Sequence, residues 1–128
     1  MGVINTQLIS STALTAGGNI PVGNVVHRNC CNMSAGGTTW NIEGSGFFRI
    51  IANITVEPTA VAEMAITLSN NGATIAQAAG TPAVAGDAVN ISLVGVVYNR
   101  CGCANDSITL TLGSAGTVTE RDVVIEKI

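Results

Sequence analysis

Apolar and polar residues alternate one by one along several stretches of this chain, and this pattern constrains the fold more than any other feature. In GFFRIIANITV, residues 46–56, every second residue from Phe48 to Val56 is apolar. The same alternation recurs in AEMAITLS, DAVNISLVGVV and SITLTL. A repeat of two places successive side chains on opposite faces of a β-strand, and no stretch carries the spacing of an amphipathic helix. The chain is therefore expected to be all-β.

Turn signals separate the alternating stretches and predict a series of short strands. Eight or nine strands are expected, over residues 3–9, 22–28, 38–43, 46–56, 62–69, 73–78, 87–98, 107–112 and 120–127. The dipeptide Asn71-Gly72 lies between two of these runs and predicts a tight hairpin. A chain of this many strands without helices is typical of an antiparallel β-sandwich, and the count suits a jelly roll.

The length of the chain sets the expected domain organisation. A chain of 128 residues can bury a core of its own, so residues 1–128 are expected to form one domain. Residues 1–18, MGVINTQLISSTALTAGG, are compatible with either a first strand or a short attachment arm.

Composition excludes several classes of partner. The net charge is −3 with five Lys and Arg residues, whereas a nucleic-acid-binding surface needs a basic patch, so no nucleic-acid partner is expected. Hydrophobic residues make up 47% of the chain, but no run approaches the length of a membrane span, and no membrane partner is expected. The start, MGVINTQLIS, lacks the basic and apolar regions of a signal peptide, so synthesis in the cytoplasm without export is expected.

Two of the predicted strands are apolar on both faces. In residues 87–98 the face opposite the predicted core carries Val94, Val96 and Tyr98, and in residues 46–56 it carries Phe47 and Ile51. Contiguous apolar surface on a soluble protein marks an interface, and symmetric self-association is the commonest kind. An oligomer is therefore expected.

The order of these features resembles a known family. The stretch GSGFFRIIANITVEPTAVAEMAITLSNNGATIAQA is similar to the middle of tumour necrosis factor-like and complement-globular-head jelly rolls, in which a Gly-aromatic pair opens a long central strand and an Asn-Gly hairpin follows the next. IPVGNVVHRN before it, and VNISLVGVVYNRCGCANDSITLTL and VVIEKI after it, follow the order of that family. The resemblance covers nearly the whole chain and points to its bacterial or bacteriophage branch.

The resemblance implies a ten-strand sandwich that forms a homotrimer. In that family the outward face of the inner sheet is buried along a three-fold axis, which fits the apolar second faces of this chain. The residues implied at the trimer interface are Phe47, Val94, Val96 and Tyr98. The chain departs from the animal members in having four aromatic residues, so aliphatic side chains would provide much of the axial packing.

The sequence offers little that supports catalysis, and no enzyme activity and no cofactor are expected. The only histidine, His27, precedes Arg28 at the end of a predicted strand, where a lone histidine is more often a surface or packing residue than a base or a ligand. The acidic residues are scattered, and none forms the paired carboxylates of a glycosidase.

The four cysteines lie in two close pairs, Cys30 with Cys31 and Cys101 with Cys103. Adjacent cysteines seldom bond to one another, because disulfide geometry requires converging β-carbons, so disulfides between the two pairs are the preferred interpretation. A zinc site of four thiolates is an alternative, although structural zinc ligands usually stand further apart in sequence. Free buried thiols are the third possibility.

The resemblance to the bacteriophage branch, together with the lack of catalytic or aromatic binding residues, implies a structural protein of a virus particle. The preferred function is a virion surface protein, either a capsid decoration protein or a head-fibre trimer of a tailed bacteriophage, with itself and the major capsid protein or another virion protein as partners. A receptor- or glycan-binding module at a phage tail or fibre tip is one alternative, weakened by the scarcity of aromatic residues that anchor such sites. A spore-surface domain of the exosporium type is another, weakened because the chain has no collagen-like repeat.

Overall fold

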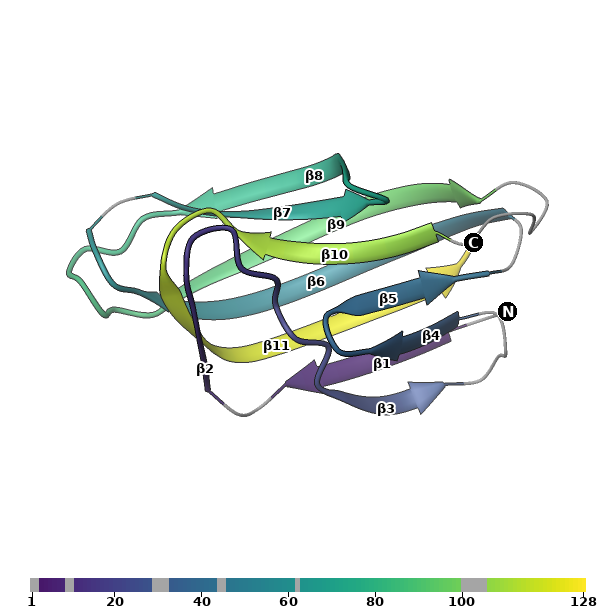
Figure 1. The fold of residues 1–128 in the computed structure, drawn as a ribbon, viewed down its shortest axis with the longest axis horizontal. Coiled ribbons are helices and arrows are strands. Elements are labelled where there is room, and N and C mark those ends of the chain that lie inside the picture. Colours follow the sequence, from purple (N-terminus) through teal and green to yellow (C-terminus); the bar gives the residue numbers. More distant parts are fainter. Residues whose placement is uncertain (1–2, 9–10, 29–32, 44–45, 62, 100–105) are drawn as a thin grey trace.

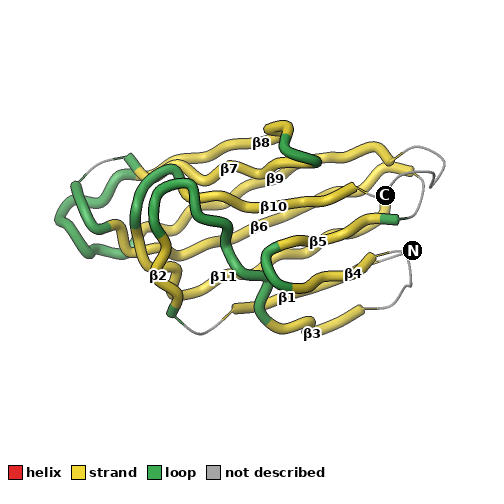
Figure 2. The backbone as a smooth tube through the Cα atoms, viewed as in Figure 1, coloured by secondary structure: helices red, strands yellow, loops and turns green. Residues whose placement is uncertain are grey.

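The computed structural model describes residues 3–8, 11–28, 33–43, 46–61, 63–99 and 106–128; for His27 and Arg28 it describes the backbone alone. These residues form eleven strands and no helix, and all the pairings between strands are antiparallel (Figures 1 and 2). The prediction of an all-β sandwich is confirmed. The strands are arranged in two sheets that pack face to face.

The first sheet contains the longest strands of the molecule. Its order is β3-β1-β11-β6-β9, and the short strand β2 also pairs with β11. The bounds are β1 Val3–Leu8, β2 Thr12–Leu14, β3 Asn24–Arg28, β6 Gly46–Pro58, β9 Val89–Asn99 and β11 Gly116–Lys127. Strand β6 lies at full length between β11 and β9, so these three strands form the broad part of the sheet.

The second sheet is built from five shorter strands in the order β4-β5-β10-β7-β8. Their bounds are β4 Met33–Gly36, β5 Thr39–Ile42, β7 Met64–Asn70, β8 Ala73–Gly80 and β10 Asp106–Leu112. Because consecutive strands of the chain repeatedly cross between the two sheets, each sheet is completed only by residues that are distant in sequence.

The core lies between the inward faces of the two sheets. The alternating residues predicted to face it are buried in every long strand, and the fully buried ones include Ile50, Ile66 and Leu110. Strand β6 shows strict alternation, with buried residues from Phe48 to Pro58 at every second position. The period-two prediction for the core face is therefore confirmed.

The predicted hairpin at Asn71-Gly72 is confirmed between β7 and β8. Asn70 pairs with Ala73, which leaves two residues in the turn. Both have positive φ, 51° at Asn71 and 87° at Gly72, as a type I′ turn requires. Glycine adopts this conformation without the steric cost that other residues incur, so the dipeptide fixes the register of the hairpin.

The structure contains more strands than the sequence predicted. Strands β2 and β4, three and four residues long, were missed because TAL and MSAG are too short to show an alternating pattern. Strand β11 begins at Gly116 rather than at residue 120, because its first residues add to the sheet beside β2 and β6. The other strands differ from their predicted bounds by one or two residues at an end.

A polar contact joins the two sheets inside the core. The indole Nε1 of Trp40, on β5, donates a hydrogen bond of 3.0 Å to Thr6 Oγ1 on β1. Arg121 Nη1, on β11, donates to the same oxygen at 3.1 Å, and its guanidinium carbon lies 5.2 Å from the centroid of the Trp40 ring. Since all three side chains are buried, this contact fixes how the sheets face one another.

The sandwich is elongated, and its two ends differ. The N- and C-terminal strands reach one end, on the right of Figure 1. At the opposite end the loop between β6 and β7 lies beside the loop between β8 and β9, where the Gly86 N–H donates to the Pro58 carbonyl at 2.9 Å.

Candidate subunit interface

An apolar patch lies on the outward face of the first sheet. It consists of Phe47 and Ile51 on β6 and Val94, Val96 and Tyr98 on β9. Four of the five side chains are more than half exposed: Phe47 by 54%, Val94 by 60%, Val96 by 53% and Tyr98 by 56%. Single exposed apolar residues are ordinary, but a contiguous group of this size marks an interaction surface.

The register between β6 and β9 brings the patch together. Phe47 pairs with Tyr98, and their ring centroids lie 4.7 Å apart with the ring planes tilted by 39°. Ile51 pairs with Val94 four residues further along β6. Because β9 is the edge of the sheet, the patch continues to the boundary of the molecule rather than ending in the middle of a face.

An ion pair borders the patch. Arg49 pairs with Val96 on one side and with Glu126 of β11 on the other, and its Nε donates to Glu126 Oε1 at 2.7 Å. The pair neutralises two charges that lie beside the patch. Since an unpaired charge at an interface is costly to desolvate, this arrangement favours burial of the face by a partner.

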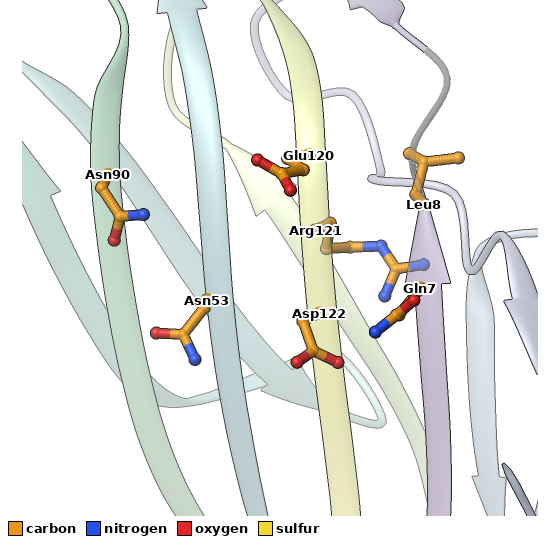
Figure 3. A pocket seen from close by; sticks show the side chains of 7 residues that line it. All are labelled: Gln7, Leu8, Asn53, Asn90, Glu120, Arg121 and Asp122. Atoms are coloured by element: carbon orange, nitrogen blue, oxygen red, sulfur yellow. The ribbon is translucent and has the colours of Figure 1, made fainter. Parts of the chain in front are cut away.

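The other half of the same face is polar and contains a pocket of about 240 Å³. Its lining comes from four neighbouring strands, β1, β11, β6 and β9, and consists of Gln7, Leu8, Asn53, Asn90, Glu120, Arg121 and Asp122 (Figure 3). Amides and carboxylates beside an apolar patch reproduce the usual combination of a polar rim and an apolar centre in protein interfaces.

Hydrogen bonds across β6 and β9 hold part of this polar half in place. Ser92 Oγ donates to Asn53 Oδ1 at 2.6 Å, and Asn90 Nδ2 donates to Thr55 Oγ1 at 3.3 Å. On the β1 and β11 side, Asn5 Oδ1 and Asp122 Oδ1 are buried and have no hydrogen-bond partner in the described part of the chain. Both atoms are already shielded from solvent by the chain itself, so they are not available to donors from a partner.

Arg121 occupies the inner wall of the pocket and was missed by the sequence analysis. Its side chain is 2% exposed and turns toward Gln7 and Leu8 (Figure 3). Burial lowers the pKa of its guanidinium to about 10, although Asp122 acts in the opposite direction. A register shift in β11 between Val118 and Glu120 places Arg121 on the core side, and no pattern in TERDVVIEKI indicates that shift.

The four interface residues inferred from the sequence resemblance share one face. Phe47, Val94, Val96 and Tyr98 all belong to the apolar patch, but the monomer does not test whether another subunit contacts them. Cys30, Cys31, Cys101 and Cys103 lie outside the described residues, as does the side chain of His27. The disulfide, zinc and free-thiol interpretations therefore all stay open.

The described residues contain no cluster of metal-binding side chains and no membrane-spanning helix. No three of their His, Cys, Asp and Glu side chains gather closely enough to hold a metal ion. No helix within the described ranges could cross a membrane.

Comparison with known proteins identifies the fold. No protein-family model and no curated protein matches the sequence. Among solved structures, the globular domain of zebrafish complement 1qA superposes with a TM-score of 0.78 at 5% identity, over 100% of this chain and 98% of that one. Murine APRIL superposes with a TM-score of 0.75 at 14% identity, over 99% of this chain and 98% of its own.

A third similar structure is the PRD1 vertex protein P5, with a TM-score of 0.66 and 14% identity over 99% of this chain and 96% of that chain. The chain thus has the antiparallel jelly-roll fold of tumour necrosis factor-like and complement globular domains, and the resemblance inferred from the sequence is confirmed for the fold. At these identities the similarity concerns the fold alone.

Proposed function

We propose that this chain is a structural, non-enzymatic protein of a virus particle surface, which assembles as a homotrimer through the outward face of its first sheet. In this proposal it acts as a capsid decoration protein or head-fibre trimer of a tailed bacteriophage. The apolar patch of β6 and β9 is the observation that carries the proposal, because four large side chains more than half exposed on one face require a partner.

The shape of the face supports self-association. Its centre is apolar, the charges of Arg49 and Glu126 beside it are paired with one another, and its far half offers amide and carboxylate groups. Three copies related by a three-fold axis would each bury one such face, and closed symmetry is the usual outcome for soluble homo-oligomers.

The location on a virion is supported by one of the similar structures. The PRD1 protein P5 is named as a vertex protein, and its fold covers 99% of this chain. The tumour necrosis factor-like and complement structures superpose with higher TM-scores, so the proposed virion location depends on the P5 similarity together with the sequence analysis.

Imaging of purified particles tests this proposal. Cryo-electron microscopy of particles that contain the protein should show regular density of three-fold symmetry on the capsid, into which three copies of the sandwich fit. Density confined to a tail tip would contradict the structural role and favour the receptor-binding alternative. Absence of the protein from the particles would contradict a virion role altogether.

A further inference from the structure

Two loops at the end of the sandwich opposite the termini carry the same apolar tripeptide. Ala60-Val61-Ala62 follows β6, and Ala83-Val84-Ala85 follows β8. The exposed residues of these loops form what we call the loop tip: Ala60, Val61, Ala83, Val84 and Ala85. Val61 is 59% exposed and Val84 is 61% exposed, so the two largest side chains of the tip point away from the core.

The loop tip is separate from the apolar patch. The patch occupies the C-terminal part of β9, from Val94 to Tyr98, whereas the β8–β9 loop precedes the first residue of that strand, Val89. In Figure 1 the two loops project together from the end that lies furthest from the labelled termini. Trimerisation through the patch therefore leaves a second exposed apolar surface to be explained.

Hydrogen bonds and buried prolines hold the two loops in place. The Gly86 N–H donates to the Pro58 carbonyl at 2.9 Å and joins one loop to the other. The Asp87 N–H donates to the Val84 carbonyl at 3.1 Å and closes a turn with Val84 at its start. Both Pro58 and Pro82 are buried. A surface whose backbone is fixed before binding loses little conformational entropy when a partner docks.

Additional bonds attach the first loop to the rest of the fold. The Thr59 N–H donates to the Ala115 carbonyl at 3.2 Å, and the Thr59 hydroxyl donates to the same oxygen at 3.3 Å. Val61 thus follows backbone that is hydrogen-bonded at Thr59. Val84 precedes backbone that is hydrogen-bonded at Gly86 and Asp87.

The charges around the loop tip have one sign. Glu57, Glu63 and Asp87 are exposed beside the two loops. None of the five Lys and Arg residues, at positions 28, 49, 100, 121 and 127, lies within residues 57–63 or 80–88. Apolar side chains surrounded by carboxylates are complementary to an apolar pocket surrounded by lysine and arginine side chains.

We infer that the loop tip is a docking site for a protein surface on which apolar pockets are rimmed by lysine and arginine. The inference rests on the proposed function, in which such a surface belongs to another protein of the particle. A lipid surface fits less well, because the three carboxylates would be repelled by an anionic bilayer. A trimer would present three tips at one end, so that weak individual contacts would be strengthened by multivalency.

The test uses particles produced without this gene product, to which purified protein is added. We expect wild-type protein to bind at saturable copy number and less tightly as salt is raised, since salt screens exposed charges. The double variant Val61→Ser/Val84→Ser should bind about tenfold more weakly, because removal of central apolar contacts typically has an effect of this order. The double variant Glu63→Lys/Asp87→Lys should also bind more weakly and lose the salt dependence.

Matched control variants make the same kinds of substitution, apolar to serine and acidic to lysine, at the other end of the molecule. Ile128→Ser removes an apolar side chain that is 68% exposed, and Glu43→Lys reverses an exposed charge after β5. Both should bind as wild type does. Circular dichroism of every variant should match wild type, since all six side chains substituted in the tip variants and controls are exposed.

The outcomes distinguish failure of this inference from failure of the proposed function. Wild-type binding that both tip variants retain in full would overturn the docking site and leave the virion role intact. Failure of wild-type protein to bind the particles would contradict both. Binding to phosphatidylglycerol-containing vesicles that depends on Val61 and Val84, without binding to particles, would replace the protein partner with a lipid surface.

Discussion

Phe47 and Tyr98 pair directly across β6 and β9, with their ring centroids 4.7 Å apart, yet each side chain remains more than half exposed. Two tilted aromatic rings at the surface, outside the buried core, contribute little to the stability of the monomer. Large rings of this kind contribute most when a partner buries them, and they commonly anchor interfaces. The pair therefore marks the centre of the proposed subunit contact.

The substitution Val96→Asp should disrupt assembly more than the fold. Val96 is 53% exposed in the monomer, so a carboxylate there remains solvated in a free subunit, whereas in the trimer it would be buried in an apolar contact at a cost of several kcal/mol. Analytical ultracentrifugation should show a dissociated protein with a native circular dichroism spectrum. The control Thr74→Asp adds a charge to an exposed position of β8, in the second sheet, and should remain assembled. Asn90→Asp adds a charge to the polar half of the same face of β9 and shows whether that half also contacts a partner.

An unchanged sedimentation coefficient for Val96→Asp would place Val96 outside the interface. If Asn90→Asp leaves the sedimentation coefficient unchanged while Val96→Asp dissociates the protein, the contact lies on the C-terminal half of β9.

The hairpin between β7 and β8 provides a test of the fold. Gly72 has a φ of 87° and a substituted methyl group there would meet no atom within 4 Å, so Gly72→Ala should cost about 1 kcal/mol through backbone strain alone. Gly36→Ala is the matched control, since a methyl group there also meets nothing within 4 Å and its φ is ordinary. Denaturant unfolding of both variants measures the difference, and equal stabilities would contradict the type I′ turn.

The buried Arg121 should be replaceable by a residue without charge. Arg121→Met keeps much of the side-chain volume in the core and removes a buried cation, so the variant is expected to be as stable as wild type or more stable at neutral pH. Arg121→Ala leaves a cavity beside Trp40 and should be destabilised by about 2 to 4 kcal/mol. Thermal unfolding followed by circular dichroism compares the three proteins.

The stability difference between wild type and Arg121→Met should depend on pH in one direction. Burial lowers the pKa of Arg121 to about 10 in the folded protein, below its ordinary value, so above that pH the unfolded chain binds more protons than the folded one. The cost of burying the charge is fully present below the folded pKa and is relieved as pH rises through it. Wild type should gain stability relative to Arg121→Met as the pH rises above about 10; a constant difference would contradict the lowered pKa.

Cysteine pairing remains a prediction, and the positions of the flanking strands are compatible with it. Met33 and Asp106, which begin the strands after the two cysteine-bearing segments, both pair with Ile42 of β5, so the two segments end at neighbouring places in the second sheet. Disulfides between Cys30 or Cys31 and Cys101 or Cys103 would close loops for which the chain-entropy model gives roughly 4 kcal/mol. Peptide mapping of oxidised particles should find such links, whereas four free thiols or one bound zinc per four cysteines would exclude them.

The sequence predicted the long strands because their core-facing residues recur at every second position. Phe48 to Val56 and Ile108 to Leu112 alternate without interruption, and the structure buries the predicted face in each. The apolar second face of β9 was also predictable, since Val94, Val96 and Tyr98 break the expected polar alternation. Strands β2 and β4 were not predictable, because three or four residues cannot establish a period.

Two features of the site depend on tertiary structure and could not be read from the sequence. Arg121 faces the core because the register of β11 shifts between Val118 and Glu120, and a shift of one residue exchanges the two faces of a strand. The polar pocket brings together residues as distant in sequence as Gln7 and Asp122, which only the pairing of β1 with β11 makes neighbours. The loop tip likewise required the contact between Gly86 and Pro58.

The mass of the purified protein in solution tests the central claim most directly. If the apolar patch is buried between three subunits as proposed, native mass spectrometry or sedimentation equilibrium at micromolar concentration should give three times the 12.9 kDa mass of one chain. The trimer should persist when salt is raised, since its centre is apolar. A stable monomer at that concentration, with Phe47 and Tyr98 exposed to water, would contradict the account.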